Sequence, residues 1–183
     1  NPARASARRS SARAAWSPES QLAARVWSFD PAEPIDAAFF RRRVRNAVEF
    51  RRFLRLDAPS GGCRLIHSEG DALPGLIADR YGEFIVVQFL STGTERFRSE
   101  IVDALRSATG ARGIYERSDA GVRAKEGLPE RCGVVAGEAP PNPIVIEENG
   151  AKFAVDVRHG QKSGFYFDQR DARAHQGVHV RIR

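Results

Sequence analysis

Long apolar runs are missing from this chain of 183 residues. No stretch approaches the roughly 18 to 20 consecutive apolar residues that a membrane-spanning helix needs. We therefore expect a protein that does not enter a membrane. The N-terminus is rich in arginine, alanine and serine but lacks the apolar segment of a secretory signal peptide. An arginine-rich, acid-poor start is also typical of transit peptides, although compositional bias explains it equally well.

Cysteine is scarce. Cys63 and Cys132 are the only two cysteines, and both lie outside any C-x-x-C motif or Cys/His cluster. This scarcity favours a reducing, cytoplasmic setting, and neither thiol is given a role. One pair of histidines, His175 and His179, has the i,i+4 spacing of metal ligands on a helix, but a glycine and a valine lie between them. We therefore predict no metal site.

The sequence motifs of several common enzyme classes are also absent. No G-x-G-x-x-G follows a strand-like segment, and neither G-x-x-x-x-G-K-[ST] nor G-x-S-x-G occurs. These motifs bind dinucleotides, cradle nucleotide phosphates and present a nucleophilic serine, respectively. The sequence therefore does not support a dehydrogenase, a P-loop NTPase or a serine hydrolase.

Lysine is rare, whereas arginine is abundant, with 3 lysines against 26 arginines. The net charge of +6 is also distributed unevenly. Residues 1–56 hold 12 arginines and 5 acids, which gives +7, and residues 57–183 hold 17 basic and 18 acidic residues, which gives −1. Such asymmetry is typical of contact with a polyanion such as nucleic acid. The alternative is a solvated basic arm that binds nothing specifically.

The N-terminal third divides into an arm, a short strand and a helix. Residues 1–15 are of low complexity and are predicted to be disordered, residues 16–20 form a turn, and residues 21–29 form a strand. A linker with proline at both ends, residues 30–34, follows.

Asp36 is a candidate N-cap for a helix that runs to about Leu56. Its period places apolar side chains on one side: Phe39, Phe40, Val44, Ala47, Val48, Phe50 and Leu54. The other side carries a guanidinium face: Arg41, Arg42, Arg45 and Arg52. We assign the apolar side to the core, and the basic face is either solvated or laid on phosphate.

The rest of the chain predicts an α+β domain of mainly antiparallel strands with two helices. Strands are expected at residues 63–67, 75–79 and 84–90 as a meander, then at 113–116, 144–147 and 152–157. A helix with an apolar stripe is expected at residues 94–108, ending before Gly110. Asn149-Gly150 predicts a tight hairpin turn. We expect Asp71 and Asp79 to bond nearby backbone N–H groups, a structural role.

The segment GQKSGFYFDQR, residues 160–170, combines turn residues, three aromatic residues with strand propensity and a polar Asp-Gln-Arg triplet. The triplet brings an acceptor, an amide and a guanidinium together, as expected of a strand that faces a ligand. An amphipathic hairpin with a solvated polar end stays open as the alternative.

Several strings in this chain resemble one protein family. They are EGDALPGLIADRYG, IYERSD followed by R-x-x-EGLP, IEENGAKFAVDV and GQKSGFYFDQR, and with their order and spacing the resemblance covers about residues 17–173. They resemble the S-adenosylmethionine (SAM)-dependent ribosomal RNA methyltransferases, and in particular the large-subunit ribosomal RNA cytosine-5 methyltransferase I family.

The resemblance implies an N-terminal PUA domain that binds RNA, a central α+β domain and a C-terminal Rossmann-like domain that holds SAM. Residues 16–34 would then be a PUA remnant and linker, residues 35–159 the central domain, and residues 160–183 a hairpin and the start of the methyltransferase domain. The implied SAM contact is Gln169, and the further implied cofactor-binding residues are Asp168, Arg170, Lys162 and Phe165. Lys162, Gly164 and Phe165 would shape the hairpin.

The chain also departs from the family pattern. Asp171-Ala-Arg173 stands where the family has a Glu-Asn-Arg-like helix start, and the family's glycine-rich SAM-binding turn is not found. Neither Cys63 nor Cys132 matches the catalytic cysteine motif. No catalytic residue is therefore assigned, and we expect a truncated member that is inactive alone. It would bind ribosomal RNA through the guanidinium face. Alternatives are a split enzyme with a separate methyltransferase-domain chain, a homodimer, and a non-catalytic RNA-binding or interaction domain.

Overall fold

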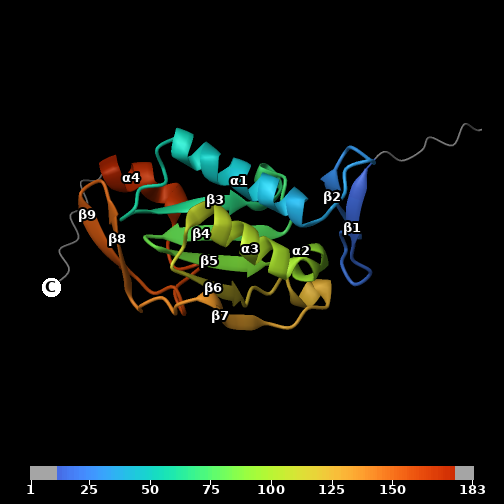
Figure 1. Cartoon of the computed structure of the whole chain (residues 1–183). Coiled ribbons are helices and arrows are strands. Elements are labelled where there is room, and N and C mark those ends of the chain that lie inside the picture. The colour runs from blue at the N-terminus through green and yellow to red at the C-terminus, as the bar shows by residue number, and fades with distance from the viewer. Residues whose placement is uncertain (1–11, 176–183) are drawn as a thin grey trace, which may run out of the picture.

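A five-stranded sheet forms the centre of the molecule (Figure 1). The structure is a computed structural model, and it describes residues 12–175. The strand order of the sheet is β3–β4–β5–β6–β7. The strands are β3 (Gly62–His67), β4 (Leu76–Tyr81), β5 (Phe84–Phe89), β6 (Gly113–Ser118) and β7 (Arg131–Gly137). The predicted antiparallel meander of β3, β4 and β5 is confirmed.

The second half of the sheet adds two strands, of which β6 was predicted at residues 113–116. β6 runs parallel to β5 because two helices form the crossover between them. β7 pairs antiparallel with β6, and no strand was predicted at its residues. Its alternation is weak because it is an edge strand whose side chains are exposed or half-buried, and two glycines, Gly133 and Gly137, lie within it at positive φ.

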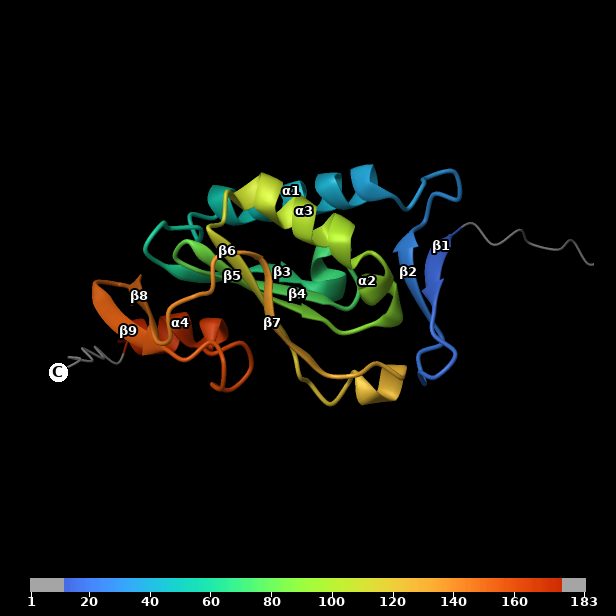
Figure 2. The same cartoon turned by 60° about the horizontal axis from the view of Figure 1, so that its bottom comes forward.

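Helices α1 (Ala37–Phe53) and α3 (Arg98–Thr109) lie side by side on one face of the sheet (Figure 2). The Asp36 N-cap is confirmed, since its carboxylate accepts a hydrogen bond from the Phe39 N–H at 2.9 Å. α1 ends at Phe53, before the predicted Leu56, because Arg55 adopts a left-handed conformation (φ 56°).

The helix predicted over residues 94–108 is divided in two. A short helix, α2 (Thr92–Arg96), begins with a capping box between Ser91 and Thr94, and α3 follows after Phe97 leaves the helical conformation. The Phe97 ring packs on Phe40, with 4.9 Å between ring centroids, so the break places this side chain in the core. The helix ends at Gly110 as predicted.

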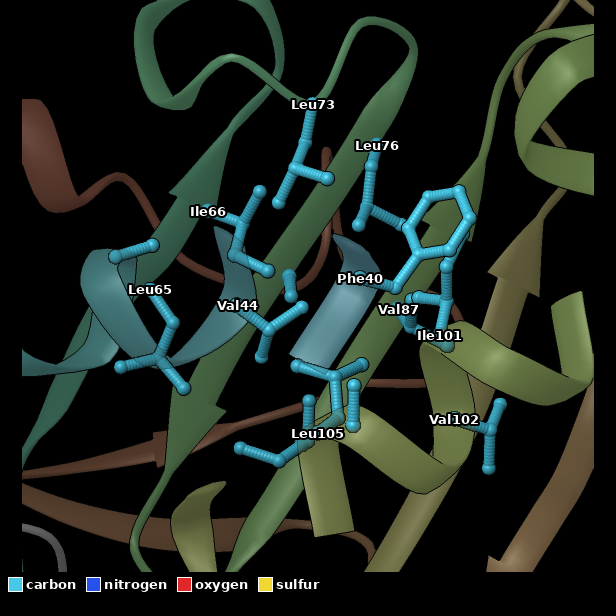
Figure 3. Packing of buried hydrophobic residues seen from close by; sticks show 14 of the residues in the cluster. Phe40, Val44, Leu65, Ile66, Leu73, Leu76, Val87, Ile101, Val102 and Leu105 are labelled. Carbon is cyan, nitrogen blue, oxygen red and sulfur yellow. The ribbon is translucent and has the colours of Figure 1, made fainter. Parts of the chain in front are cut away.

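The main core fills the space between α1, α3 and the sheet (Figure 3). Successive β5 residues point to opposite faces, so Ile85 and Val87 meet the helices while Phe84 and Val86 face the other way. The labelled side chains in Figure 3 come from α1, α3 and three strands, with Leu73 from a connection: Phe40, Val44, Leu65, Ile66, Leu73, Leu76, Val87, Ile101, Val102 and Leu105.

A second core lies on the opposite face of the sheet, under the hairpin of β8 (Ile144–Glu148) and β9 (Ala151–Val155). Asn149 and Gly150 both have positive φ (52° and 78°), as a type I′ turn requires, so the hairpin prediction is confirmed. Its buried members come from β4, β5, β8, β9 and the residues after them: Tyr81, Phe84, Val86, Ile144, Ile146, Val155 and Val157.

A two-stranded hairpin of β1 (Arg13–Trp16) and β2 (Ala24–Ser28) lies at the other end of the molecule from β8 and β9 (Figure 1). Disorder over residues 1–15 was therefore the wrong prediction for Arg13 to Ala15, which pair with β2. Residues 1–11 lie outside the described part of the chain. β2 falls within the predicted strand and buries Trp27 against Phe39 and Phe40.

The predicted strand and hairpin at residues 165–170 are wrong. The chain reverses at Lys162 (φ 59°) and Gly164 (φ 120°) and then forms a 3₁₀ turn, η3 (Phe167–Gln169), and a short helix, α4 (Arg170–His175). Phe165 and Phe167 pack on the second core, where Phe167 lies 5.4 Å from Tyr81 between ring centroids. Their hydrophobicity serves packing and not strand pairing.

A membrane-spanning helix and a metal-binding cluster are both absent from the described part of the chain. Within residues 12–175, no helix combines the length and apolar character needed to span a bilayer. In the same part of the chain, no three histidine, cysteine or acidic side chains gather in a group that would hold a metal ion. His179 of the histidine pair lies beyond the described residues.

Candidate functional site

A cleft of about 560 Å³ opens between the end of α1, β3 with the following turn η1 (Ser68–Asp71), and the loop of residues 162–168. The α1 side supplies Phe50, Arg51 and Leu54, and Leu56 follows. The remaining lining residues come from β3, η1 and the loop: Arg64, His67, Gly70, Asp71, Lys162, Phe165, Tyr166, Phe167 and Asp168. The cleft therefore brings together two motifs that are nearly one hundred residues apart in the sequence.

Phe50 and Leu54 were predicted to lie in the core, and the structure corrects this. Both line the cleft instead, and Phe50 is 53% exposed while Leu54 is 45% exposed. The buried stripe of α1 ends at Val48 because the last turn of the helix faces the cleft rather than the core.

A buried polar network lies at the base of this region. Asp79, which is fully buried, accepts two hydrogen bonds from the Arg64 guanidinium, at 2.8 and 3.0 Å, and one from the Ser163 hydroxyl. The Ser163 hydroxyl also lies 3.0 Å from that of Tyr81. The hydrogen bonds to Asp79 raise the pKa of Arg64, and burial, with the Asp79 charge, raises the pKa of Tyr81. These groups keep their charged and neutral forms, respectively, at neutral pH.

The roles of the two aspartates differ from each other. Asp79 was predicted to bond backbone N–H groups, but its partners are side chains, because it lies in the middle of β4 between two other strands. Asp71 follows the prediction, since its carboxylate accepts from the His67 N–H at 2.6 Å, and it also forms a paired contact with Arg51. Asp71 thereby ties η1 to α1 along one side of the cleft.

The structure brings three of the predicted cofactor-binding residues to the cleft and leaves two outside it. Lys162, Phe165 and Asp168 line it, and the Lys162 ammonium lies 5.3 Å from the centre of the Tyr166 ring. Gln169 is exposed on η3 but does not line the cleft. Arg170 points instead to Glu148 on β8, with Nε 3.4 Å from the carboxylate.

Arg173 is an important residue that the sequence did not single out. Its guanidinium makes two hydrogen bonds with the buried Glu148 carboxylate, at 2.7 and 3.0 Å, and a third with the Tyr166 carbonyl at 2.9 Å. It also lies 4.4 Å from the centre of the Phe165 ring. Arg173 therefore fixes the loop to the β8–β9 hairpin. Its position one helical turn after Arg170 was the available indication in the sequence.

Gly164 shapes the loop, although the hairpin implied by the family resemblance is not formed. Its φ of 120° lies in the range that favours glycine, and an added Cβ would lie 2.8 Å from Val155 Cγ1. The loop thus packs directly on the end of β9.

The four predicted RNA-binding arginines lie exposed on α1, but three of them have acidic neighbours. Arg42 pairs with Glu33, Arg45 approaches Glu49 at 4.0 Å, and Arg52 pairs with Asp57 at 3.2 Å. Arg41 is also exposed. The positive charge of this face is therefore partly offset by neighbouring carboxylates.

The R-x-x-EGLP string joins the β1–β2 hairpin to the region of α2. Arg123 is fully buried, donates to the Pro129 carbonyl at 2.8 Å and pairs with Glu95 at 2.9 Å. Glu126 accepts from Arg25 of β2 at 3.1 Å and from the Thr92 N–H at 3.3 Å. These contacts are structural and fasten the β1–β2 hairpin to α2.

Neither cysteine has the environment of a nucleophile. Cys63 is buried in the main core, and burial together with the Asp57 charge raises its pKa to about 12. Cys132 is exposed on β7, and desolvation raises its pKa as well. Because the thiolate is the reactive form, both thiols are poor nucleophiles near neutral pH.

Comparison with known proteins finds relatives in sequence and neighbours in structure. The chain is 53% identical, over 162 residues, to the Ribosomal RNA large subunit methyltransferase I of Aeromonas salmonicida. This match covers 88% of the chain and 41% of the relative, so the chain spans less than half the length of that relative. No protein-family model matches the chain.

The solved structures agree in fold. A putative SAM-dependent methyltransferase from Streptococcus mutans has a TM-score of 0.71 and 24% identity, over 88% of this chain and 41% of that one. A putative methyltransferase complexed with SAH has a TM-score of 0.70 and 24% identity, over 87% of this chain and 40% of that one. At this identity the likeness shows a shared fold.

Proposed function

We propose that this chain is the central part of a SAM-dependent methyltransferase that modifies C5 of a cytosine in large-subunit ribosomal RNA. The observation that carries the proposal is the 53% identity over 162 residues to the Aeromonas salmonicida relative, which is named Ribosomal RNA large subunit methyltransferase I. The position of GQKSGFYFDQR supports it, because this segment of the resemblance forms one wall of an open cleft.

Methylation at C5 requires a thiolate that adds to C6 of a cytosine held outside its stack. The chain's own thiols do not suit this step, since burial raises the pKa of Cys63 to about 12 and desolvation raises that of Cys132. We therefore assign the nucleophile and the SAM-binding turn to a further domain. That domain would be joined to this chain or carried by a separate polypeptide, and the isolated 183-residue chain would be inactive.

The residues of the loop would have different tasks in this enzyme. SAM would supply the methyl group, and Lys162, Phe165 and Asp168 would form the wall beside it, in the part of the site that this chain provides. Gln169 has an exposed side chain on η3 and would reach SAM from there. Arg170, together with Arg173, would position the loop through Glu148 rather than contact SAM.

The remaining parts of the assignment follow from the same family resemblance. Residues 16–34 would belong to a PUA domain, residues 35–159 to the central domain, and residues 160–183 to the start of the methyltransferase domain. The substrate would be ribosomal RNA in the cytoplasm. Arg41, Arg42, Arg45 and Arg52 would add a weak, salt-sensitive contact to its backbone.

An exchange of segments tests this function. In the Aeromonas salmonicida relative, the 162 matched residues are replaced by those of this chain. We expect transfer of a labelled methyl group from SAM to C5 of a cytosine in unmodified large-subunit RNA. A folded exchange protein that transfers no methyl group, or that methylates another base, would contradict the proposal.

The isolated chain and one pair of variants complete the test. Labelled SAM should show no saturable binding to the 183-residue chain, and a micromolar site would contradict its inactivity alone. In the exchange protein, Gln169→Ala should weaken SAM binding. Asp171→Asn, which changes an exposed residue two positions away, is the matched control and should leave SAM binding unchanged.

A further inference from the structure

The wall of the cleft opposite the loop has no role in the function proposed above. It consists of Phe50 and Leu54 on the last turns of α1, with Leu56 after them. Phe50 is 53% exposed, although it belongs to a residue type that is usually buried. An exposed aromatic ring on this wall therefore lines the same open space as the aromatic residues of the loop.

Cations accompany the aromatic rings of both walls. The Arg51 guanidinium lies 5.6 Å from the centre of the Phe50 ring, and the Lys162 ammonium lies 5.3 Å from the centre of the Tyr166 ring. Aromatic faces beside cations are what proteins use to bind unpaired nucleotides, since every base has a π-face and every nucleotide carries a phosphate. An apolar peptide has no anionic group that would pair with these cations.

Within residues 12–175, two charged side chains that line the cleft form no ion pair with another side chain and can therefore bind a ligand. Arg51 and Arg64 are already paired with Asp71 and Asp79. No such partner lies within 4.0 Å of Lys162 or Asp168 in the described residues, and both are exposed. An ammonium suits a phosphate oxygen, and a carboxylate suits a sugar hydroxyl or the exocyclic amine of a base.

The size of the cleft limits the ligand. A volume of about 560 Å³ lies within the range of small-ligand sites, so it accommodates a single nucleotide and not a duplex. An acceptor for a 2′-hydroxyl would also favour RNA over DNA. In contrast, the exposed arginines of α1 lie on a face without these aromatic walls and are mostly paired with acids.

We propose that this cleft binds one unpaired nucleotide of the RNA substrate. The base lies against Phe50 and Tyr166, Lys162 contacts the phosphate, and Asp168 accepts from the 2′-hydroxyl or the exocyclic amine of the base. This assignment rests on the proposed function for the identity of the substrate as RNA, and it gives that substrate a site on this chain.

Binding of a single-stranded RNA of about ten nucleotides, a length within the range of single-stranded sites, tests the proposal on the full chain. The RNA carries one 2-aminopurine, whose fluorescence falls when the base stacks. We expect quenching with the unaltered chain. Phe50→Ala should abolish the quenching and raise the Kd roughly 5- to 150-fold, the loss expected when one stacked base is released.

Phe53→Ala is the matched control. Phe53 is 81% exposed on the same helix but does not line the cleft, so this change should leave Kd and quenching unaltered. Lys162→Gln should reduce the slope of log K against log salt by about 0.7, the contribution of one phosphate contact on a single strand. Lys152→Gln, an exposed lysine on β9, should not change that slope. Asp168→Asn should reduce the preference for RNA over DNA of the same sequence.

Several outcomes would overturn the assignment. Equal effects of Phe50→Ala and Phe53→Ala, or tighter binding of duplex than of single-stranded RNA, would place the RNA elsewhere. Displacement of the RNA by SAM would show that the cleft binds the cofactor and not the RNA. Far-ultraviolet circular dichroism confirms that each variant is folded. The methyl-transfer test is independent of this one: an active exchange protein with an unaltered Kd for Phe50→Ala refutes the cleft alone, and specific cleft binding without methyl transfer refutes the proposed function alone.

Discussion

Removal of the Ser163 hydroxyl should destabilise the whole chain, because this group joins two buried polar side chains. It donates to the buried Asp79 carboxylate and lies 3.0 Å from the Tyr81 hydroxyl. Hydrogen bonds to charged groups contribute about 1.5–3 kcal/mol, and a neutral one contributes about 1 kcal/mol. Ser163→Ala should therefore lower the free energy of unfolding by about 2.5–4 kcal/mol.

The loss is measurable by urea or thermal unfolding, followed by the fluorescence of the buried Trp27. For a chain of this size, about 2.5–4 kcal/mol corresponds to a fall in Tm of about 5–16 °C. Ser60→Ala removes an exposed hydroxyl from a loop and should change stability by less than about 0.5 kcal/mol.

A double-mutant cycle identifies the shared contact. Tyr81→Phe removes the other hydroxyl of the pair, and the double variant with Ser163→Ala should cost less than the sum of the two single changes, by at least about 0.5 kcal/mol. Asp79→Ala should cost about 3 kcal/mol, the lower end of the range for a broken buried pair, because the Arg64 side chain keeps 27% exposure to solvent. Strict additivity of the first pair, or a Ser163→Ala cost below about 0.5 kcal/mol, would refute the network.

Three further changes test other parts of the fold. Burial raises the pKa of Glu126, but hydrogen bonds from Ser20, the Thr92 N–H and Arg25 give a net lowering. Its stabilising contribution is therefore present above its unfolded pKa and lost as pH falls through the folded value, so Glu126→Gln should flatten the acid limb of an unfolding curve recorded below about pH 5. Iodoacetamide at neutral pH should label the exposed Cys132 slowly and the buried Cys63 not at all in the native chain, and both after denaturation, as counted by mass spectrometry. Gly164→Ala should lower the free energy of unfolding by more than about 1 kcal/mol, whereas Gly121→Ala, with open space at its Cβ position, should cost less.

The elements with strong local patterns were the predictable part of this fold. Asp36, Gly110 and the Asn149-Gly150 turn were predicted where a single residue type satisfies a backbone requirement, and the structure has a cap or turn at each. The meander was predictable because its strands are short, apolar and separated by turn residues. β7 was missed because its residues lie at an edge with little alternation.

The aromatic loop was misjudged for a physical reason. Phe165, Tyr166 and Phe167 have strand propensity, but propensity does not say whether an edge is available for pairing. A left-handed Lys162 and the φ of Gly164 turn the chain so that its rings enter the second core instead. The ion pairs of Arg170 and Arg173 with Glu148 were equally out of reach, because the partners lie more than twenty residues apart in the sequence.

The cleft and the buried network connect two motifs that are far apart in the sequence, so a substitution in one motif affects the other. Asp79 in LPGLIADRY accepts a hydrogen bond from Ser163 in GQKSG, and Arg64 pairs with Asp79 while lining the cleft beside Lys162 and Asp168. A change at Asp79 therefore leaves Ser163 and Arg64 without their buried acceptor, and it also loosens the loop that forms the cleft wall. The stability of the sheet and the shape of the proposed nucleotide site thus depend on the same carboxylate.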